Sequence, residues 1–347
     1  MFAKLVSPPR LHYQAEMADP SIDALRRAAE TDDVAALTRF GRRLLDETEP
    51  DAVAEAALVL DRATHLGGTE APAMLAPLFA VGAGAPQNWK TALDLLQIAA
   101  ERGSSSAQGQ LAALADAERV LRGVAPEAPE RWRRLRVSID VPSWSRAGPQ
   151  VVLHPAPRIS RYDNFISPAV CAWLIGRAEG RVTPARVFHP VGGEGLLDQS
   201  RSNSALEFKL ADMDVVLAML RFRVAAVVGV QPADLEAPQV LHYRVGQRFE
   251  RHYDFLDADL PGHTRELAER GQRIITFLIY LNGDFDGGET DFPLLDQRCK
   301  PPAGGALCFV NIDPAGAPDR RTLHAGLTPT RGEKWLFSQW IRRPPIR

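Results

Sequence analysis

His252 and Asp254 lie two positions apart in the segment RFERHYDF. In an extended strand, residues two apart project from the same face, so both side chains could bind one ion. His324, in TLHAGL near the end of the chain, is the natural third ligand. Two imidazoles and one carboxylate form the facial ligand set of non-haem Fe(II) sites, which leaves adjacent positions open on the metal. The three residues therefore predict an iron site that favours an anionic chelator.

An H-x-D triplet on its own also suits a surface His-Asp pair, because a chain with eight histidines can contain one by chance. Lys334 adds to the pattern, since it follows His324 by about ten residues in GEKWLFSQW. A buried lysine is costly without an anion, so a ligand carboxylate is a physical reason to keep it there. The alternatives are a lysine in solvent, or Arg331 as the cation. Tyr243 and Thr276 could offer hydroxyls to the same carboxylate.

Four motifs in order, YRVGQRFERHYDF, QRIITFLIYLN, FDGGETDFP and LHAGLTPTRGEKW, resemble the prolyl 4-hydroxylase branch of the 2-oxoglutarate and Fe(II)-dependent dioxygenases. The resemblance spans roughly residues 157–343 and implies a double-stranded β-helix, a form of jelly roll. Several ordered motifs are more specific than one triplet. We therefore expect a dioxygenase domain over 157–343.

The resemblance also implies roles for single residues. The two histidines and the aspartate described above would bind iron, and Lys334 and Tyr243 would bind the far carboxylate of 2-oxoglutarate. Thr276 is implied as a further contact with this co-substrate. Glu236 and Arg201 resemble polar positions that line the substrate groove, although a solvated surface position suits each of them as well.

The implied reaction uses Fe(II), 2-oxoglutarate and O2, and it couples release of succinate and CO2 to hydroxylation of a substrate. The favoured substrate is a prolyl residue in a peptide or protein. One alternative is a free amino acid or another small molecule, which would need a closed pocket in place of an open groove. Another is an adaptor whose sheet domain is catalytically idle. The family also suggests ascorbate as a helper that keeps iron reduced.

The elements that must position these residues fall into two kinds. After residue 237, short runs rich in Val, Ile, Phe, Tyr and Leu alternate with turns such as NGDFDGG and KPPAGG. Many short strands with such turns indicate an antiparallel sandwich or jelly roll. Segments 164–179 and 212–228 are expected to be helices that precede them. The predicted fold class is α+β.

The first part of the chain is rich in alanine and leucine at helical spacing. Ala57, Leu58 and Leu60 recur about 35 residues later as Ala-Leu-x-Leu, a period that suits stacked pairs of helices. The segment ALDLLQIAAERGSSSAQGQLAAL resembles a Sel1-like or tetratricopeptide-type repeat, while a plain helical bundle is the alternative. We expect a helical-repeat domain over 20–125 and a proline-rich, basic linker over 126–156.

Composition sets the remaining limits. The 347 residues carry 41 Lys+Arg against 43 Asp+Glu, so no broad basic face is expected for nucleic acid or anionic lipid. The three cysteines are widely spread and lack a CxxC pair, which argues against a disulfide framework and favours the cytoplasm. No signal peptide or membrane-spanning segment is expected. A protein substrate recruited by the helical repeats is the favoured partner, and the oligomeric state stays open.

Overall fold

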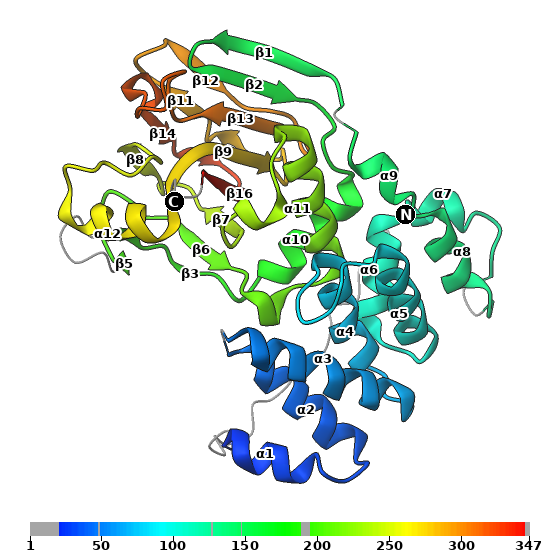
Figure 1. Cartoon of the computed structure of the whole chain (residues 1–347). Helices are drawn as coiled ribbons and strands as arrows, with labels where there is room; N and C mark the ends of the chain where they lie inside the picture. The colour runs from blue at the N-terminus through cyan, green and yellow to red at the C-terminus, as the bar shows by residue number, and fades with distance from the viewer. Residues whose placement is uncertain (1–20, 48, 126–127, 147, 189–194, 344–347) are drawn as a thin grey trace.

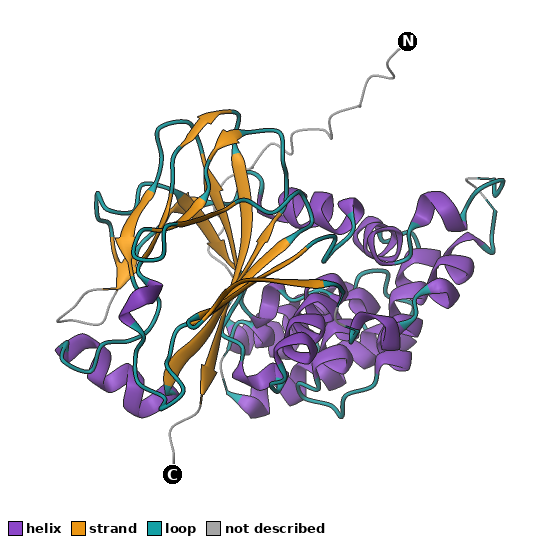
Figure 2. Ribbon diagram, turned by 90° about the horizontal axis from the view of Figure 1, so that it is seen from above, coloured by secondary structure: helices purple, strands orange, loops and turns teal. Residues whose placement is uncertain are grey.

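The computed structural model describes residues 21–47, 49–125, 128–146, 148–188 and 195–343. A helical half, formed by the first part of the chain, adjoins a half built of antiparallel sheets (Figure 1). Seen from above, the strands gather on one side of the molecule and most helices on the other (Figure 2). The α+β fold class predicted from the sequence is confirmed.

Six consecutive helices begin the helical half, and each packs against the next one along the chain. They are α1 Ile22–Ala28, α2 Val34–Leu45, α3 Pro50–His65, α4 Ala71–Val81, α5 Trp89–Glu101 and α6 Ser105–Leu114. Asp33, Asn88 and Ser104 begin α2, α5 and α6, because each side chain accepts a hydrogen bond from a first-turn N–H. Small residues bring the helices close, since a Cβ on Gly41 would lie 2.7 Å from the Leu60 side chain. The predicted serial stack is observed, and its assignment to the Sel1 type stays a prediction.

The segment 126–156, predicted as a linker, contains two short helices and a strand among its described residues. After α7 (Ala117–Val120) come α8 (Arg131–Ser138), α9 (Val141–Trp144) and β1 (Gln150–Pro155). α8 packs against α5 and α6, whereas α9 packs against α11 of the sheet half. The segment therefore belongs to the packing of both halves, and the domain limits themselves stay a prediction.

The sheet half contains two main sheets in which every recorded strand pairing is antiparallel. The larger has the order β1-β2-β13-β9-β16-β7-β6-β3, and the smaller has the order β12-β11-β14-β8. The strands of the larger sheet after β1 are β2 Arg158–Tyr162, β3 Thr183–Pro184, β6 Ser204–Glu207, β7 Gln239–Tyr243, β9 Gln272–Tyr280, β13 Ala306–Val310 and β16 Lys334–Arg343. Those of the smaller sheet are β8 Phe249–His252, β11 Thr290–Phe292, β12 Gln297–Cys299 and β14 His324–Gly326. Two short pairs complete the strands, β4 Val187–Phe188 with β5 Gly195–Leu196, and β10 Asp286–Gly287 with β15 Pro329–Arg331.

Helices cover one face of the larger sheet and flank the smaller one. They are α10 Pro168–Ala178, α11 Val215–Val228 and α12 Pro261–Arg270, with 3-10 turns η1 Leu210–Asp212, η2 Pro232–Asp234 and η3 Arg320–Thr322. α10 and α11 fall within the two helical segments predicted from the sequence. The apolar cluster that includes Tyr243, Tyr280, Phe292 and Phe309 joins the larger sheet to the smaller one. This two-sheet arrangement confirms the predicted double-stranded β-helix.

The two halves share a buried interface, in which α4 and α6 pack against α10 and α11 (Figure 1). The Gln110 Oε1 atom on α6 accepts a hydrogen bond from the Val215 backbone N–H at the start of α11, at 2.9 Å. Beside it, Gly109 leaves room for the Trp173 ring, which would lie 2.4 Å from an added Cβ. The helical half is therefore fitted to the sheet half. No helix within the described ranges is long and apolar enough to cross a membrane.

Candidate active site

Two neighbouring strands of the smaller sheet bring the three candidate metal ligands to one place. β14 pairs with β8 so that His324 stands opposite His252, and their ring centroids are 4.2 Å apart. Asp254 follows β8 directly, and its carboxylate oxygens lie 3.6 Å from His252 Nε2 and 3.5 Å from His324 Nε2. One donor atom from each residue falls within 4.8 Å of the other two. The juxtaposition predicted from the sequence is observed.

Backbone carbonyls hold both imidazoles in one orientation. The Nδ1–H of His252 donates to the Glu250 carbonyl at 2.7 Å, and the Nδ1–H of His324 donates to the Thr322 carbonyl at 3.0 Å. A carbonyl only accepts, so Nδ1 carries the proton and each Nε2 keeps its lone pair toward Asp254. This is the tautomer in which an imidazole binds a metal through Nε2.

Burial tunes the charge states of this group. It lowers the pKa of His252 to about 3, helped by the neighbouring His324 ring. Burial acts on Asp254 in the opposite sense, but the two imidazoles and the Thr276 hydroxyl outweigh it and hold the pKa of that carboxyl below its usual value. A neutral imidazole and an ionised carboxylate are the forms that bind a cation. The donor set thus fits a divalent iron ion.

Lys334 begins β16 opposite Tyr243 on β7, and its side chain is only 1% exposed. Its Nζ donates to the Gly288 carbonyl at 2.8 Å and lies 5.0 Å from the ring centroids of both Tyr243 and Tyr280. No carboxylate among the described residues lies within salt-bridge distance of it. Burial lowers the pKa of Lys334 to about 7, against the opposing charge of Glu289. Lys334 is therefore buried and not in solvent, and its role as the anchor of a ligand carboxylate stays a prediction.

A small inner cavity of about 40 Å³ connects this lysine with the metal-ligand group. Its lining combines apolar side chains with a few polar and charged groups, a mixture that suits a short dicarboxylate. The apolar wall consists of Leu241, Leu278 and Leu336. Arg331, the alternative cation, instead lies at the surface, where it forms an ion pair with Asp286.

Thr290 also lines the inner cavity and was not predicted from the sequence. It is buried on β11, and its hydroxyl is hydrogen-bonded to the Tyr280 hydroxyl at 2.8 Å. The alternation in the segment ETDFP could have predicted that Thr290 faces the interior, because Thr290 and the core residue Phe292 project from the same face of the strand.

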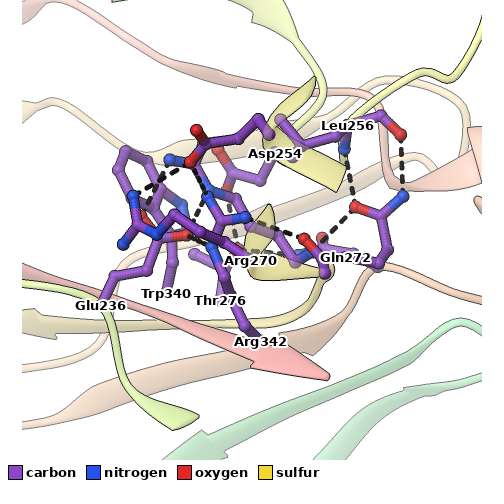
Figure 3. A network of polar contacts seen from close by, with 12 residues as sticks. Glu236, Asp254, Leu256, Arg270, Gln272, Thr276, Trp340 and Arg342 are labelled. Atoms are coloured by element: carbon purple, nitrogen blue, oxygen red, sulfur yellow. Dashed lines mark hydrogen bonds and ion pairs between the residues drawn. The ribbon is translucent and has the colours of Figure 1, made fainter. Parts of the chain in front are cut away.

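The structure gives Thr276 a different contact from the one predicted. Its hydroxyl donates to Asp254 Oδ2 at 2.7 Å and accepts from Asn311 Nδ2 at 3.0 Å (Figure 3). The residue does not line the inner cavity. Its hydroxyl is engaged with a candidate metal ligand, and its assignment as a contact of 2-oxoglutarate stays a prediction.

Glu236 likewise departs from its prediction. It is 9% exposed, and its carboxylate forms short ion pairs with Arg273 and Arg342, each at 2.6 Å at closest approach (Figure 3). Arg342 reaches on to Glu266 of α12 at 2.6 Å. Glu236 therefore lies neither in the cleft nor in solvent, but in a buried ionic network behind the cleft wall. Its partner Arg273, stacked 3.9 Å above the Trp340 ring, is the group that reaches the cleft.

Arg201 lies beside the metal-ligand group and is not a solvated surface residue. It is 8% exposed, donates to the Arg186 carbonyl at 2.9 Å, and lies 4.7 Å above the Phe249 ring. Phe249 in turn stacks on His252, with centroids 3.5 Å apart and an angle of 15°. Arg201 lines both the inner cavity and the outer cleft, so its position agrees with a substrate contact.

The outer cleft has a volume of about 460 Å³ and opens beside the metal-ligand group. It shares His252, Asp254 and Arg201 with the inner cavity, so the two spaces adjoin at the metal-ligand group. Aromatic side chains are frequent in its lining, namely Phe249, Tyr253, Phe255 and Trp340. Neither these four rings nor Arg273 were predicted as site residues, because only the tertiary fold turns them toward one space.

Comparison with known proteins agrees with this geometry. The model of the 2OG-Fe(II) oxygenase superfamily matches residues 238–342. Prolyl 4-hydroxylase 1 of Arabidopsis thaliana is 31% identical over 221 residues, which cover 60% of this chain and 72% of that protein. The chain belongs to the prolyl 4-hydroxylase family of 2-oxoglutarate and Fe(II)-dependent oxygenases. It is thus an oxygenase that uses Fe(II), 2-oxoglutarate and O2.

Other relatives match a smaller share of their own length. "Probable prolyl 4-hydroxylase 7" of Arabidopsis thaliana is 29% identical, over 53% of this chain and 62% of that protein. Prolyl 4-hydroxylase subunit alpha-1 of Rattus norvegicus is 31% identical over 56% of this chain and 37% of that protein. The chain therefore spans less than two thirds of the length of these two relatives.

Two solved structures share partial similarity with the chain. The viral collagen prolyl hydroxylase of Paramecium Bursaria Chlorella virus-1, in complex with 2OG, is 28% identical over 53% of this chain and 95% of that chain, with a TM-score of 0.41. A Sel1 repeat protein from Oxalobacter formigenes is 21% identical over 37% of this chain and 52% of that chain, with a TM-score of 0.25.

Proposed function

We propose that this oxygenase hydroxylates a prolyl residue in a peptide or protein, with release of succinate and CO2 from 2-oxoglutarate. The observation that carries the proposal is the meeting of His252, Asp254 and His324 where a cavity that ends at a buried lysine joins an open cleft. We assign these three residues as the iron ligands. Bound iron would supply the activation of O2, and the protein would supply the position of both substrates.

In this proposal 2-oxoglutarate occupies the inner cavity. Its far carboxylate would pair with the Lys334 ammonium group, with hydroxyls from Tyr243 and Thr290 beside it. The buried amine has no carboxylate partner among the described side chains, so a bound dicarboxylate would offset its desolvation. The leucine walls would exclude water from the chain of the co-substrate.

The shape of the outer cleft supports a peptide over a free amino acid. An open cleft of about 460 Å³ admits a chain that passes through it, whereas a small molecule is better held in a closed pocket. Aromatic rings such as Tyr253 and Trp340 offer flat apolar faces to a pyrrolidine ring. The relatives named above as prolyl 4-hydroxylases support the same substrate class. Arg201 and Arg273 would face the polar backbone of such a peptide.

We further propose that the helical half recruits the protein substrate, in a cytoplasmic setting with ascorbate as the reductant that restores Fe(II). The serial stack α1 to α6 presents an extended surface of the kind used for protein binding. The three buried free cysteines agree with a reducing compartment. An idle adaptor is disfavoured because burying Asp254 and Lys334 is costly unless their charges are used.

The direct test is mass spectrometry. The protein loaded with Fe(II) and 2-oxoglutarate would be incubated in air with proline-rich peptides and, separately, with free amino acids. Oxygen addition at a peptidyl proline, together with succinate formation, is expected. Oxygen addition to free amino acids alone would overturn the peptide assignment. Absence of the Fe(II)–2-oxoglutarate charge-transfer band under anaerobic conditions would overturn the site assignment itself.

A further inference from the structure

A chain of two hydrogen bonds ends on the candidate ligand Asp254. Asn311 follows β13 and is fully buried, and its Nδ2 donates to Thr276 Oγ1 at 3.0 Å. Thr276 is 1% exposed on β9, and its hydroxyl donates to Asp254 Oδ2 at 2.7 Å. The backbone of Asn311 is fixed by two hydrogen bonds. Its N–H donates to the Ile274 carbonyl, and its carbonyl accepts from the N–H of residue 319. The chain is therefore anchored on a fixed strand end.

The direction of these bonds is determined by their chemistry. A threonine hydroxyl has one proton to donate, and an asparagine amide offers donors on one side and an acceptor on the other. With Nδ2 of Asn311 toward Thr276, the hydroxyl proton is directed to Asp254. In the reverse amide orientation, Asn311 Oδ1 and Asp254 Oδ2 would both face the single hydroxyl proton of Thr276, and one of these two acceptors would have no donor. Asn311 Oδ1 is buried and has no hydrogen-bond partner among the described residues.

We propose that Thr276 and Asn311 form a positioning pair that holds the Asp254 carboxylate for iron binding through one oxygen. The proposal rests on the assignment of Asp254 as a ligand. The terminal torsion of an aspartate is broad and roughly two-fold, so an unrestrained carboxylate can turn. A hydroxyl on Oδ2 occupies a lone pair there and leaves Oδ1, which lies toward His252 Nε2, for the metal. One-oxygen binding keeps positions open for 2-oxoglutarate and O2.

The test is metal binding by variants of the full chain, followed with Fe(II) under anaerobic conditions and with Co(II) by its visible spectrum. Thr276→Val keeps the shape and removes the hydroxyl, and it should weaken metal binding about 10–100-fold, as loss of an outer partner does. Thr276→Ser keeps the hydroxyl and should stay within about threefold of wild type. Thr64→Val is the matched control, because this buried threonine donates only to the Leu60 carbonyl within α3. It should leave metal binding unchanged.

A double-mutant comparison separates positioning from general packing. Asn311→Ala should weaken metal binding less than Thr276→Val, because the hydroxyl remains but its proton is no longer directed. The double variant should bind metal no more weakly than Thr276→Val alone, since Asn311 acts through the threonine. Equal metal affinity of Thr276→Val and wild type would overturn the positioning pair, as would fully additive losses in the double variant. Failure of the wild type to bind either metal would instead overturn the ligand assignment.

Discussion

The helical half and the sheet half bury different kinds of side chain. Among described residues before 126, the buried polar side chains are Thr64, Ser104 and Gln110, and none of these carries a charge. The sheet half buries many charged groups, including Asp254 and Lys334. Burial of a charge is costly unless a partner or a ligand compensates it. The helical half is therefore stabilised mainly by apolar packing. The sheet half buries charged side chains at a cost in stability, and its candidate active site uses two of them.

The largest expected effect is at the centre of the charged half. His252→Ala should abolish hydroxylation and weaken Fe(II) binding by more than about a hundredfold, the upper range for loss of an outer partner. Anaerobic titration with 2-oxoglutarate would measure this through the charge-transfer band. His65→Ala, on the exposed end of α3, is the control and should leave the band intact. If the His252→Ala variant kept the band, iron binding would no longer explain why the sheet half buries charged side chains.

The second effect concerns the buried amine. Lys334→Met keeps much of the volume but removes the charge, and it should cost ~2–5 kcal/mol of 2-oxoglutarate binding while leaving Fe(II) binding nearly unchanged. Arg331→Met is the matched control, because this exposed cation pairs only with Asp286 at the surface. Isothermal titration would measure both affinities. Equal losses of metal and co-substrate binding would point to a folding defect and not to an anchor.

A third test uses pH to sharpen the contrast. The pKa of Lys334 is lowered by burial from 10.5 to about 7 in the free protein, so the unfolded chain holds its proton over a range in which the folded one has lost it. This burial penalty is fully present below about pH 7 and is relieved as pH rises toward the ordinary lysine value. Because the ammonium form binds a carboxylate, 2-oxoglutarate affinity should fall by up to about tenfold per pH unit above pH 7. The same pH series on Lys334→Met should be flat in this range, and an equal slope would assign the titration to another group.

The smallest effect addresses the boundary between the halves. Gln110→Ala removes the acceptor for the Val215 N–H at the buried start of α11, so it should cost ~1–3 kcal/mol of stability. Gln97→Ala on the exposed side of α5 removes only a surface bond to Glu101 and should change stability by less than about 0.5 kcal/mol. Chemical denaturation followed by circular dichroism would measure both. An unchanged midpoint for Gln110→Ala would mean that the halves are coupled less tightly than the interface indicates.

Local pattern carried much of the prediction of fold and site. Short apolar runs of the kind predicted after residue 237 lie on β7, β9, β11, β13, β14 and β16, because alternation and turn residues act over a few positions. The spacing of His252 and Asp254 is local in the same sense. His324 and Lys334 could be named because they also lie on ordered motifs of the family.

Three outcomes could not follow from local pattern. The hydrogen bond from Thr276 to Asp254 depends on how β9 lies against the segment that follows β8. Glu236 is neutralised by Arg273 and Arg342, which are 37 and 106 residues away along the chain. The cleft aromatics became visible only as neighbours in space.

By itself, the amino-acid sequence determined which segments are helices or strands, and which residue types could bind iron and a dicarboxylate. The tertiary structure alone decided which buried charge pairs with which, and which face of each strand borders the cavity. The physical reason is the distance along the chain over which each effect acts. Periodicity acts within one element, whereas the cost of burying a polar group is met only by partners that folding brings from distant elements.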